Sequence, residues 1–280
     1  NLTPRDISAI GCHGQTVRHR PDLGFSLQLN NPSLLAELTH ISVVADFRAR
    51  DVAAGGQGAP LVPAFHAAVF GDKKIHRAVV NIGGISNLTD LPVDGSISGF
   101  DCGPGNVLMD AWIQQHHGVA FDRDGIWALG GNVHSSLLQK MLAEKYFSLP
   151  PPKSTGRDLF NLPWLLPFLD NDMLPQDVQT TLLALTAQTI VDAIQRHAAG
   201  AKEIFFCGGG VRNLTLMQAL ESELAPAKVR KTDDLGIDAE HVEALAFAWL
   251  ARQTLNMKAG NVPAVTGARG ERVLGGIYPV

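Results

Sequence analysis

Apolar segments alternate with polar, glycine-rich ones along the chain, and their spacing predicts short strands and helices. Residues 25–29 alternate apolar and polar side chains, which is the period of a half-buried strand. Pro32, directly after the polar Asn31, suits the first turn of a helix. Residues 63–70 predict a second helix that ends at Gly71. Further strands are expected at residues 7–10 and 41–45, and a long polar loop at residues 46–60.

The pattern begins again after residues 71–74, so a domain boundary is expected near residue 75. Beyond it, strands are predicted at residues 78–80, 97–100, 204–207 and near 229. Helices are predicted around residues 108–112, 183–194, 213–224 and 242–250, the last with Asp238 as its N-cap. Strands that alternate with helices predict an α/β fold with substantial parallel pairing.

Composition narrows the class of protein. The 280 residues are 45% hydrophobic and 18% charged, which is typical of a globular chain of about two domains. The formal net charge is −4 and no run of Lys or Arg occurs, so neither nucleic acid nor a membrane surface is expected as a partner. No apolar stretch approaches the roughly 20 residues of a bilayer span, and no signal peptide opens the chain. Three cysteines favour reduced thiols in a cytoplasmic protein, and the histidines lack metal-ligand spacing.

Two glycine-rich motifs carry the most specific chemistry. Residues 81–89 read NIGGISNLT after an apolar run, and residues 100–106 read FDCGPGN. Glycines near strand ends let backbone N–H groups approach phosphate oxygens, which makes candidates of Gly83, Gly84, Gly103 and Gly105. Asp101 is expected inside the second turn, where its carboxylate can accept a proton. Two plainer roles stay open: a tight hairpin turn for the glycines and an N-cap for Asp101.

These motifs resemble those of the anhydro-N-acetylmuramic acid kinases, a branch of the actin-like sugar kinase superfamily. The resemblance covers essentially the whole chain. Besides the two motifs above, it rests on GCHGQTVRHRP (11–21), DFRARDVAAGGQGAPLVPAFH (46–66), FCGGGVRN (206–213) and VTGARGERVLGGIYP (265–279). It implies an actin-like (ribonuclease H-like) fold of two domains, with ATP and Mg²⁺ in the cleft. On this basis residues 1–75 are the C-terminal part of the first domain, with residues 261–280 able to return to it, and residues 76–260 are the second.

The resemblance also implies an activity. Water would open the 1,6-anhydro bond of anhydro-N-acetylmuramic acid while the γ-phosphoryl group of ATP moves to O6. The product would be N-acetylmuramic acid 6-phosphate, formed in peptidoglycan recycling by a cytoplasmic homodimer.

Site residues can be carried over from the family one by one. Asp101 matches the aspartate that activates the water, and Gly83 and Gly84 match the turn that holds the β- and γ-phosphates. The adenosine loop is matched by Gly208, Gly209 and Gly210, which a simple strand-to-helix turn also explains.

Fewer residues match the part of the family's site that binds the sugar. Arg50 suits bidentate binding of the lactyl carboxylate, although a solvated loop explains its charged neighbours equally well. Glu243 is the second substrate-side residue, although an exposed helical glutamate is commonly only solvated. His13, Gln15 and Thr16 suit a polar sugar site, although a lone His after a strand is more often a hydrogen-bonded structural residue. Residues 153–158 suit a polar loop beside this site.

One part of the family pattern has no counterpart in these 280 residues. The family opens with a GTSxDG-type hairpin, the first phosphate loop, so the first domain is expected to be incomplete at its N-terminus. Three functions therefore stay open: an ATP-dependent kinase, a non-catalytic actin-like nucleotide-binding module, and an inactive partial chain.

Overall fold

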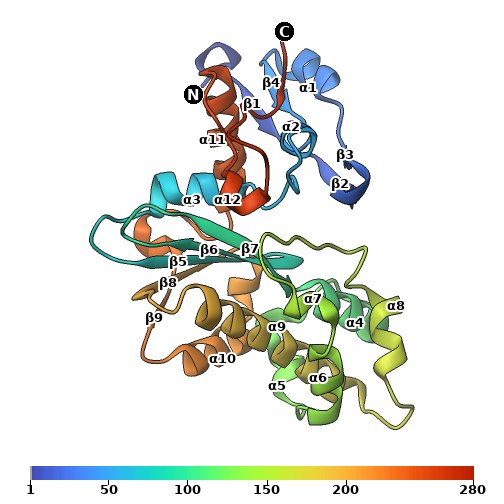
Figure 1. The fold of residues 1–280 in the computed structure, drawn as a ribbon. Coiled ribbons are helices and arrows are strands. Elements are labelled where there is room, and N and C mark those ends of the chain that lie inside the picture. Colours follow the sequence, from blue (N-terminus) through green and yellow to red (C-terminus); the bar gives the residue numbers. More distant parts are fainter. Residues whose placement is uncertain (1) are drawn as a thin grey trace.

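A computed structural model describes residues 2–280, so residue 1 of the predicted first domain lies outside the described part. The fold is mixed α/β, which confirms the predicted class. Figure 1 shows two groups of elements, one built on a three-stranded sheet and one built on a five-stranded sheet. Within residues 2–280, the first and the last segments both lie in the first group.

The three-stranded sheet joins segments that are far apart in the sequence. Its central strand is β4 (Val43–Ala45), with β1 (Ile10–Cys12) parallel to it on one side. On the other side β10 (Gly276–Tyr278) pairs with β4 in the antiparallel direction. The C-terminal segment therefore completes the sheet that the first 45 residues begin.

Two helices cover this sheet, one on each face. Val43 and Ala45 share a core cluster with Ala36 of α1 (Pro32–Thr39). Val44 points the other way, into a cluster with residues of α11 (Val242–Leu255). Beside them β2 (Gln15–Arg20) and β3 (Phe25–Leu29) form a separate antiparallel hairpin.

The five-stranded sheet has the strand order β7-β6-β5-β8-β9. Its strands β5 (Arg77–Ile82), β6 (Ile85–Leu91) and β7 (Ser98–Pro104) form an antiparallel meander. The parallel pairing that the sequence predicts is found where β8 (Glu203–Cys207) joins β5 and where β9 (Lys228–Lys231) joins β8.

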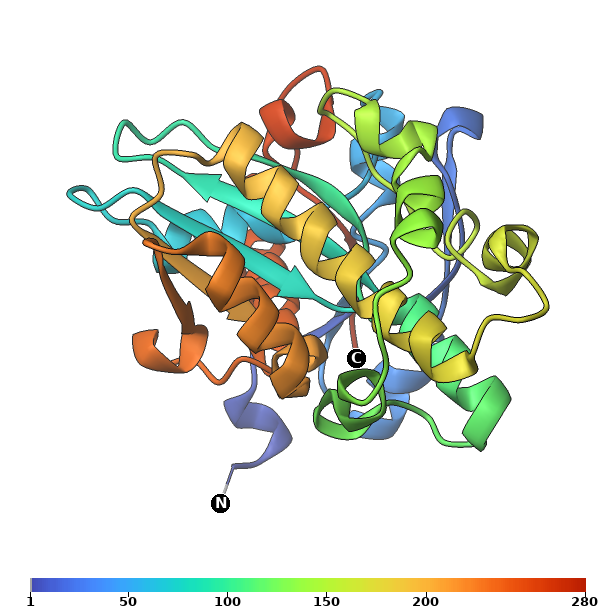
Figure 2. The same ribbon diagram turned by 90° about the horizontal axis from the view of Figure 1, so that it is seen from below.

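Helices cover both faces of this sheet. The long α9 (Pro175–His197), drawn in gold in Figure 2, runs across one face with α10 (Leu214–Leu224) beside it. The opposite face carries α3 (Val62–Phe70) and α12 (Pro263–Thr266). Three shorter helices pack on α9: α4 (Val107–His117), α5 (Ile126–Leu129) and α6 (Ser135–Leu142). Of the remaining two, α7 (Lys145–Ser148) lies against β7 and α8 (Leu162–Leu165) against α4.

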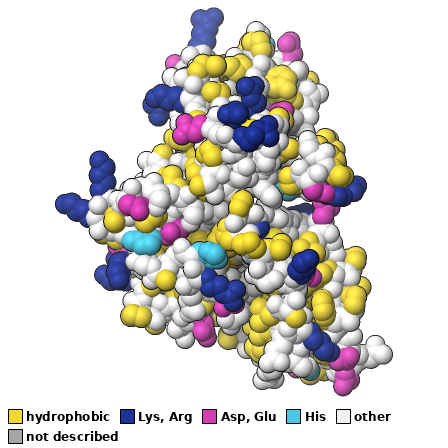
Figure 3. Space-filling view, in the orientation of Figure 1, with side chains coloured by type: hydrophobic (Ala, Val, Ile, Leu, Met, Phe, Trp, Pro, Cys, Tyr) yellow, Lys and Arg dark blue, Asp and Glu magenta, His cyan; other side chains and the backbone are white. Residues whose placement is uncertain are grey.

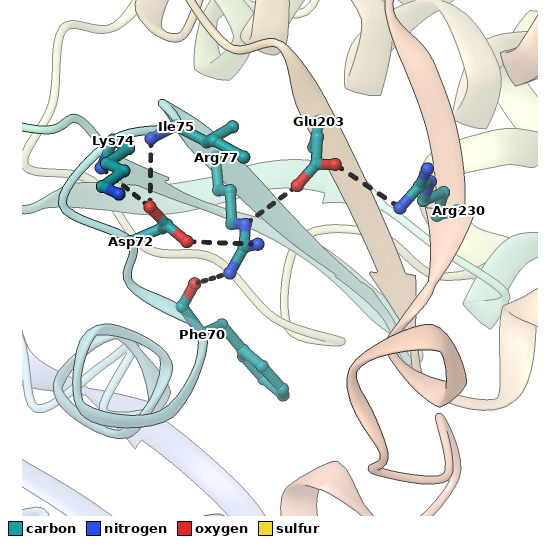
Figure 4. A network of polar contacts seen from close by, with 7 residues as sticks. All are labelled: Phe70, Asp72, Lys74, Ile75, Arg77, Glu203 and Arg230. Carbon is teal, nitrogen blue, oxygen red and sulfur yellow. Dashed lines mark hydrogen bonds and ion pairs between the residues drawn. The ribbon is translucent and has the colours of Figure 1, made fainter.

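An ion-pair network ties the starts of the parallel strands together (Figure 4). Arg77 of β5 donates from Nε to Glu203 Oε2 of β8 over 3.0 Å and from Nη1 to the Phe70 carbonyl over 3.1 Å. Arg77 Nη2 lies 3.4 Å from Asp72 Oδ2. Glu203 Oε1 also lies 3.4 Å from Nη1 of Arg230 in β9. The network joins the end of α3 to three neighbouring strands, and so fixes how the helix meets the sheet.

Three sequence-based element assignments are wrong in detail. The strand expected at residues 7–10 begins only at Ile10, after a 3-10 turn over Pro4–Asp6 and three residues without regular structure. The loop expected at residues 46–60 contains the helix α2 (Ala49–Ala53). The last long helix starts after His241 rather than at Asp238.

The surface has no single-sign patch on the face shown in Figure 3, where Lys and Arg side chains stand apart with Asp and Glu among them. Within residues 2–280, every helix is too short or too polar to cross a bilayer.

Candidate active site

A cavity of about 340 Å³ lies between the two groups of elements. Its wall combines residues of strand β2, the start of α2, the segment before α3, strands β5 and β6 with the turn between them, β7, a loop before α8 and the helix α11. The lining residues used below are Gln15, Thr16, His19, Arg48, Asn81, Gly83, Gly84, Asn87, Asp101, Thr155, Arg157 and Glu243.

Asp101 lies in this wall within strand β7, not in a turn as the sequence suggested. The glycine-rich motif continues the strand because residues 101–104 still pair with β6. The Asp101 side chain is 6% exposed and its Oδ2 accepts a 2.9 Å hydrogen bond from the Thr155 backbone N–H. It does not cap the following helix α4, whose N-cap is Asn106.

The surroundings of Asp101 make it a better base than an exposed aspartate. Burial raises the pKa of Asp101 from 3.8 to about 6, against the opposing effects of the Thr155 N–H, Arg48 and Lys153. A base with a pKa near the working pH is ionised at neutral pH and still accepts a proton readily.

Arg48 brings a positive charge to the same cavity. Its Nη1 donates to the Gly58 carbonyl over 2.6 Å, and its Nε and Nη2 lie 3.1 and 2.9 Å from His13 Nε2. Burial, together with the Arg48 charge, lowers the pKa of His13 to about 4, so this ring is neutral at pH 7 and its Nε2 accepts. Burial lowers the pKa of Arg48 while the charges of Asp101, Glu243 and Asp51 raise it, and an arginine there stays protonated.

Six of the predicted site residues line this one cavity. They are Gln15, Thr16, Gly83, Gly84, Asp101 and Glu243. His13 stands behind the wall, where it holds Arg48 and packs 4.5 Å from the Phe247 ring, centroid to centroid.

The structure does not bring three other predicted residues into the cavity. Arg50 is exposed on α2, and the arginine of this segment that reaches the cavity is Arg48. Gly103 and Gly105 are buried instead of facing a ligand. A Cβ at Gly103 would lie 2.7 Å from Phe147 Cε1, and one at Gly105 would collide with the Gly83 carbonyl, so both glycines allow internal packing.

The triple glycine after β8 lies at a second cavity, of about 480 Å³. Gly209 lines it, together with Asp110 and Arg212, whereas Gly208 and Gly210 pack against Asn81 and Ile82. Asn106 also lines this second cavity, and its backbone N–H donates to the Gly83 carbonyl over 2.8 Å. The β5–β6 turn therefore lies between the two cavities.

The sequence interpretation missed Arg48, Asn81 and Asn87. Arg48 belongs to the same charged segment as Arg50, but only the start of α2 decides which arginine turns inward. Asn81 and Asn87 flank the Gly83–Gly84 turn within the recognised motif, and only the strand register shows that they share a face with Asp101.

Comparison with known proteins matches the whole chain to one family model. The model described as "AnmK: Anhydro-N-acetylmuramic acid kinase" matches residues 1–280. A relative of that name from Nitrosomonas europaea is 56% identical over 280 residues, covering 99% of this chain and 77% of the relative. One from Pseudomonas savastanoi pv. phaseolicola is 55% identical over 281 residues, covering 100% and 77%.

Similarity to solved structures is weak. The activator of the 2-hydroxyisocaproyl-CoA dehydratase from Clostridium difficile, with bound ADPNP, matches with a TM-score of 0.42 at 13% identity, covering 77% of this chain and 70% of that one. Component A of the (R)-2-hydroxyglutaryl-CoA dehydratase from Acidaminococcus fermentans has a TM-score of 0.41 at 17% identity, covering 66% and 64%. Scores at this level carry no argument about function.

Proposed function

The chain belongs to the anhydro-N-acetylmuramic acid kinase family, and from that premise we propose that it opens and phosphorylates anhydro-N-acetylmuramic acid with ATP. The observation that carries the proposal is a buried carboxylate of raised pKa, Asp101, beside a glycine turn and an arginine on one cavity wall. The reaction would serve peptidoglycan recycling.

Asp101 acts in the first bond change. It takes one proton from a water molecule while the water oxygen bonds to the anomeric carbon C1, and the bond between C1 and O6 breaks with its electron pair on O6. O6 then bonds to the γ-phosphorus, and the bond from that phosphorus to the bridging oxygen of ADP breaks. Water, anhydro sugar and ATP become the 6-phosphorylated sugar, ADP and one proton, which Asp101 returns to solvent.

The turn at Gly83 and Gly84 suits the phosphates of the nucleotide. A Cβ at Gly84 would have no neighbouring atom nearer than 3.9 Å, and the two atoms at that distance are Nη2 of Arg157 and Cβ of Val107. Open backbone beside a guanidinium favours an anionic group. The cavity at Gly209 lies on the other side of this turn and has room for the nucleoside, so a triphosphate can extend from one cavity to the other.

Mg²⁺ is expected to arrive with the nucleotide. Within residues 2–280 no group of three or more His, Cys, Asp or Glu side chains is arranged to hold a metal ion. Because Mg²⁺ is commonly held by substrate phosphates and water with few protein ligands, the residues present form no resident site and we derive no step through the ion.

The sugar would occupy the part of the cavity between Asp101 and the smaller group. Arg48 takes the role that was expected of Arg50, namely binding of the lactyl carboxylate. Gln15, Thr16 and Glu243 supply further polar groups on the same wall. The two-domain division near residue 75, the cytoplasmic location and the homodimer stay predictions, the last checked by analytical ultracentrifugation.

The first prediction tests the base. Asp101→Asn keeps the shape of the site and loses the proton acceptor, so kcat should fall about 10²–10⁴-fold while the sugar is still bound. The measurement is ADP release by the full-length protein with anhydro-N-acetylmuramic acid and ATP, with the phosphorylated product identified by mass.

The control for this prediction is Asp172→Asn, which alters an exposed aspartate that does not line the cavity and should leave kcat unchanged. Undiminished turnover in Asp101→Asn would remove the proposed mechanism. A wild-type protein that binds nucleotide but forms no sugar phosphate would favour the non-catalytic module instead.

A further inference from the structure

Asn87 has a buried side-chain oxygen without a hydrogen-bond partner in the described part of the chain. It lines the cavity that holds Asp101, and its Oδ1 is buried yet accepts no hydrogen bond from residues 2–280. The other cavity asparagine, Asn81, is already engaged, since its Oδ1 lies 3.8 Å from Cys207 Sγ. Buried polar groups without a partner are rare in folded proteins, and each calls for a reason.

The strand register places Asn87 directly beside the base. Asn87 of β6 is the Cα partner of Asp101 of β7 in an antiparallel pair. Partners of this kind project to the same face with Cβ atoms about 4.5–5.5 Å apart. Their neighbours Leu88 and Phe100 point the other way, into the core.

One further unpartnered atom, His19 Nε2, belongs to a residue of the same cavity wall, but it comes from β2 in the smaller group. Asn87 differs from it because it stands opposite Asp101 across one strand pair. A small molecule that reaches Asp101 on this face of the strand pair therefore meets both an ionisable acceptor and a neutral one.

We propose that Asn87 Oδ1 holds the second hydrogen of the water that Asp101 deprotonates. The inference rests on the proposed function. Water has two O–H groups, and a base that takes one leaves the oxygen free to rotate about that bond. With Asn87 accepting the other hydrogen, a lone pair of the oxygen is aimed at the anomeric carbon. That second O–H bond is not broken, and it becomes the anomeric hydroxyl of the product.

A role in orienting the water differs from a role in holding the sugar. If Asn87 orients the water, Asn87→Ala should lower kcat roughly 10- to 100-fold, the cost of a misplaced reactant, and leave KM for the sugar unchanged. The melting temperature without ligands should change little, because Asn87 Oδ1 has no hydrogen-bond partner within residues 2–280 that the variant could lose. Asn132→Ala, at an exposed asparagine, is the matched control and should change neither value.

A second variant tests the closeness of the two side chains. Asn87→Asp sets a second carboxylate beside Asp101, while Arg48 and Lys153, the cations near Asp101, stay unchanged. Repulsion between the carboxylates should move the acidic limb of the kcat/KM profile to higher pH than in the wild type.

The experiment measures kcat, KM, melting temperature and the pH profile of the full-length wild type and of these variants, with the anhydro sugar and ATP. A raised KM with unchanged kcat in Asn87→Ala would assign Asn87 to sugar binding and overturn the inference. A lowered melting temperature in Asn87→Ala would make the role of Asn87 structural. Unchanged kinetics would show that Asn87 has no role in the reaction. Either result would also overturn the inference. A wild type that forms no sugar phosphate contradicts the proposed function, and this inference with it.

Discussion

Burial makes the Asp101 carboxylate more basic, and it also makes the charged form of this group unfavourable in the folded protein. One backbone N–H and two nearby cations, Arg48 and Lys153, favour its charged form, yet burial outweighs them and raises its pKa to about 6. Catalytic bases are commonly tuned in this way, by an environment that opposes their charge. Two consequences follow for pH, one for rate and one for stability.

The second prediction concerns the rate. Asp101 must be ionised to accept a proton, so kcat/KM should be level above about pH 6 and fall about tenfold per pH unit below it. Initial rates between pH 4.5 and 8 measure the profile. A limb near pH 4, the ordinary position of an aspartate, would show that another group limits the reaction.

The third prediction concerns stability. Because the pKa of Asp101 is about 6 when folded and about 3.8 when unfolded, the native state binds more protons between these values. The free energy of unfolding contributed by this group therefore falls as pH rises from 4 to 6. Asp101→Asn removes that loss, so it should stabilise the protein at pH 7 by an amount on the order of 3 kcal/mol and have little effect at pH 3.5.

Urea denaturation of wild type and Asp101→Asn at the two pH values tests the third prediction. The asparagine keeps an oxygen that can accept from the Thr155 N–H, so that hydrogen bond is not lost. Equal destabilisation at both pH values would mean that the carboxylate is structural.

At the scale of elements, the start of the short helix α2 decides which arginine reaches the cavity. Residues 48 and 50 lie two positions apart, and successive helical residues are turned by about 100°, so their side chains point to nearly opposite sides. Arg48 at the N-cap turns toward His13 and the cavity, whereas Arg50 within the helix is exposed.

The fourth prediction compares these two arginines. Arg48→Ala should raise KM for the anhydro sugar at least tenfold, because a charge-assisted contact to a carboxylate is lost. Arg50→Ala is the matched control and should change KM less than about twofold, as for other exposed charges. Steady-state kinetics with saturating ATP gives both values, and the opposite ranking would restore Arg50 as the binding residue.

At the scale of the whole molecule, a buried aspartate joins two segments from opposite parts of the chain. Asp51 is fully buried and accepts hydrogen bonds from the Gly58 N–H, Asn261 Nδ2 and Thr266 Oγ1 over 2.8, 2.7 and 2.8 Å. Gly58 in turn accepts from Arg48, so Asp51 also supports the cavity wall.

The fifth prediction follows from this junction. Asp51→Ala removes one acceptor from each of three buried donors, of which only Asn261 Nδ2 keeps another, the Gly270 carbonyl, so the free energy of unfolding should fall by roughly 3 kcal/mol. The same variant should weaken sugar binding, because Gly58 no longer holds Arg48 in place. Urea denaturation and KM measure the two effects, with Asp172→Ala as an exposed control. Full stability in Asp51→Ala would contradict the structural role.

A large part of the fold could be predicted from local patterns. Helix α1 with Pro32 in its first turn, strand β3 at residues 25–29 and helix α3 ending before Gly71 all lie where spacing and turn residues placed them. These signals are local, since they depend on side chains a few positions apart. The helix α2 escaped prediction because five residues carry too short a period to distinguish a helix from a loop.

The sequence by itself determined the family and the motif that contains Asp101, because long ordered motifs are a property of the chain alone. Only the tertiary structure decided that Asp101 lies in a strand opposite Asn87, and that Arg48 rather than Arg50 faces it. It also decided that Gly103 and Gly105 serve packing. The reason is physical: side-chain direction and burial depend on strand register and on contacts between residues that are distant in the sequence, and neither is encoded in local spacing.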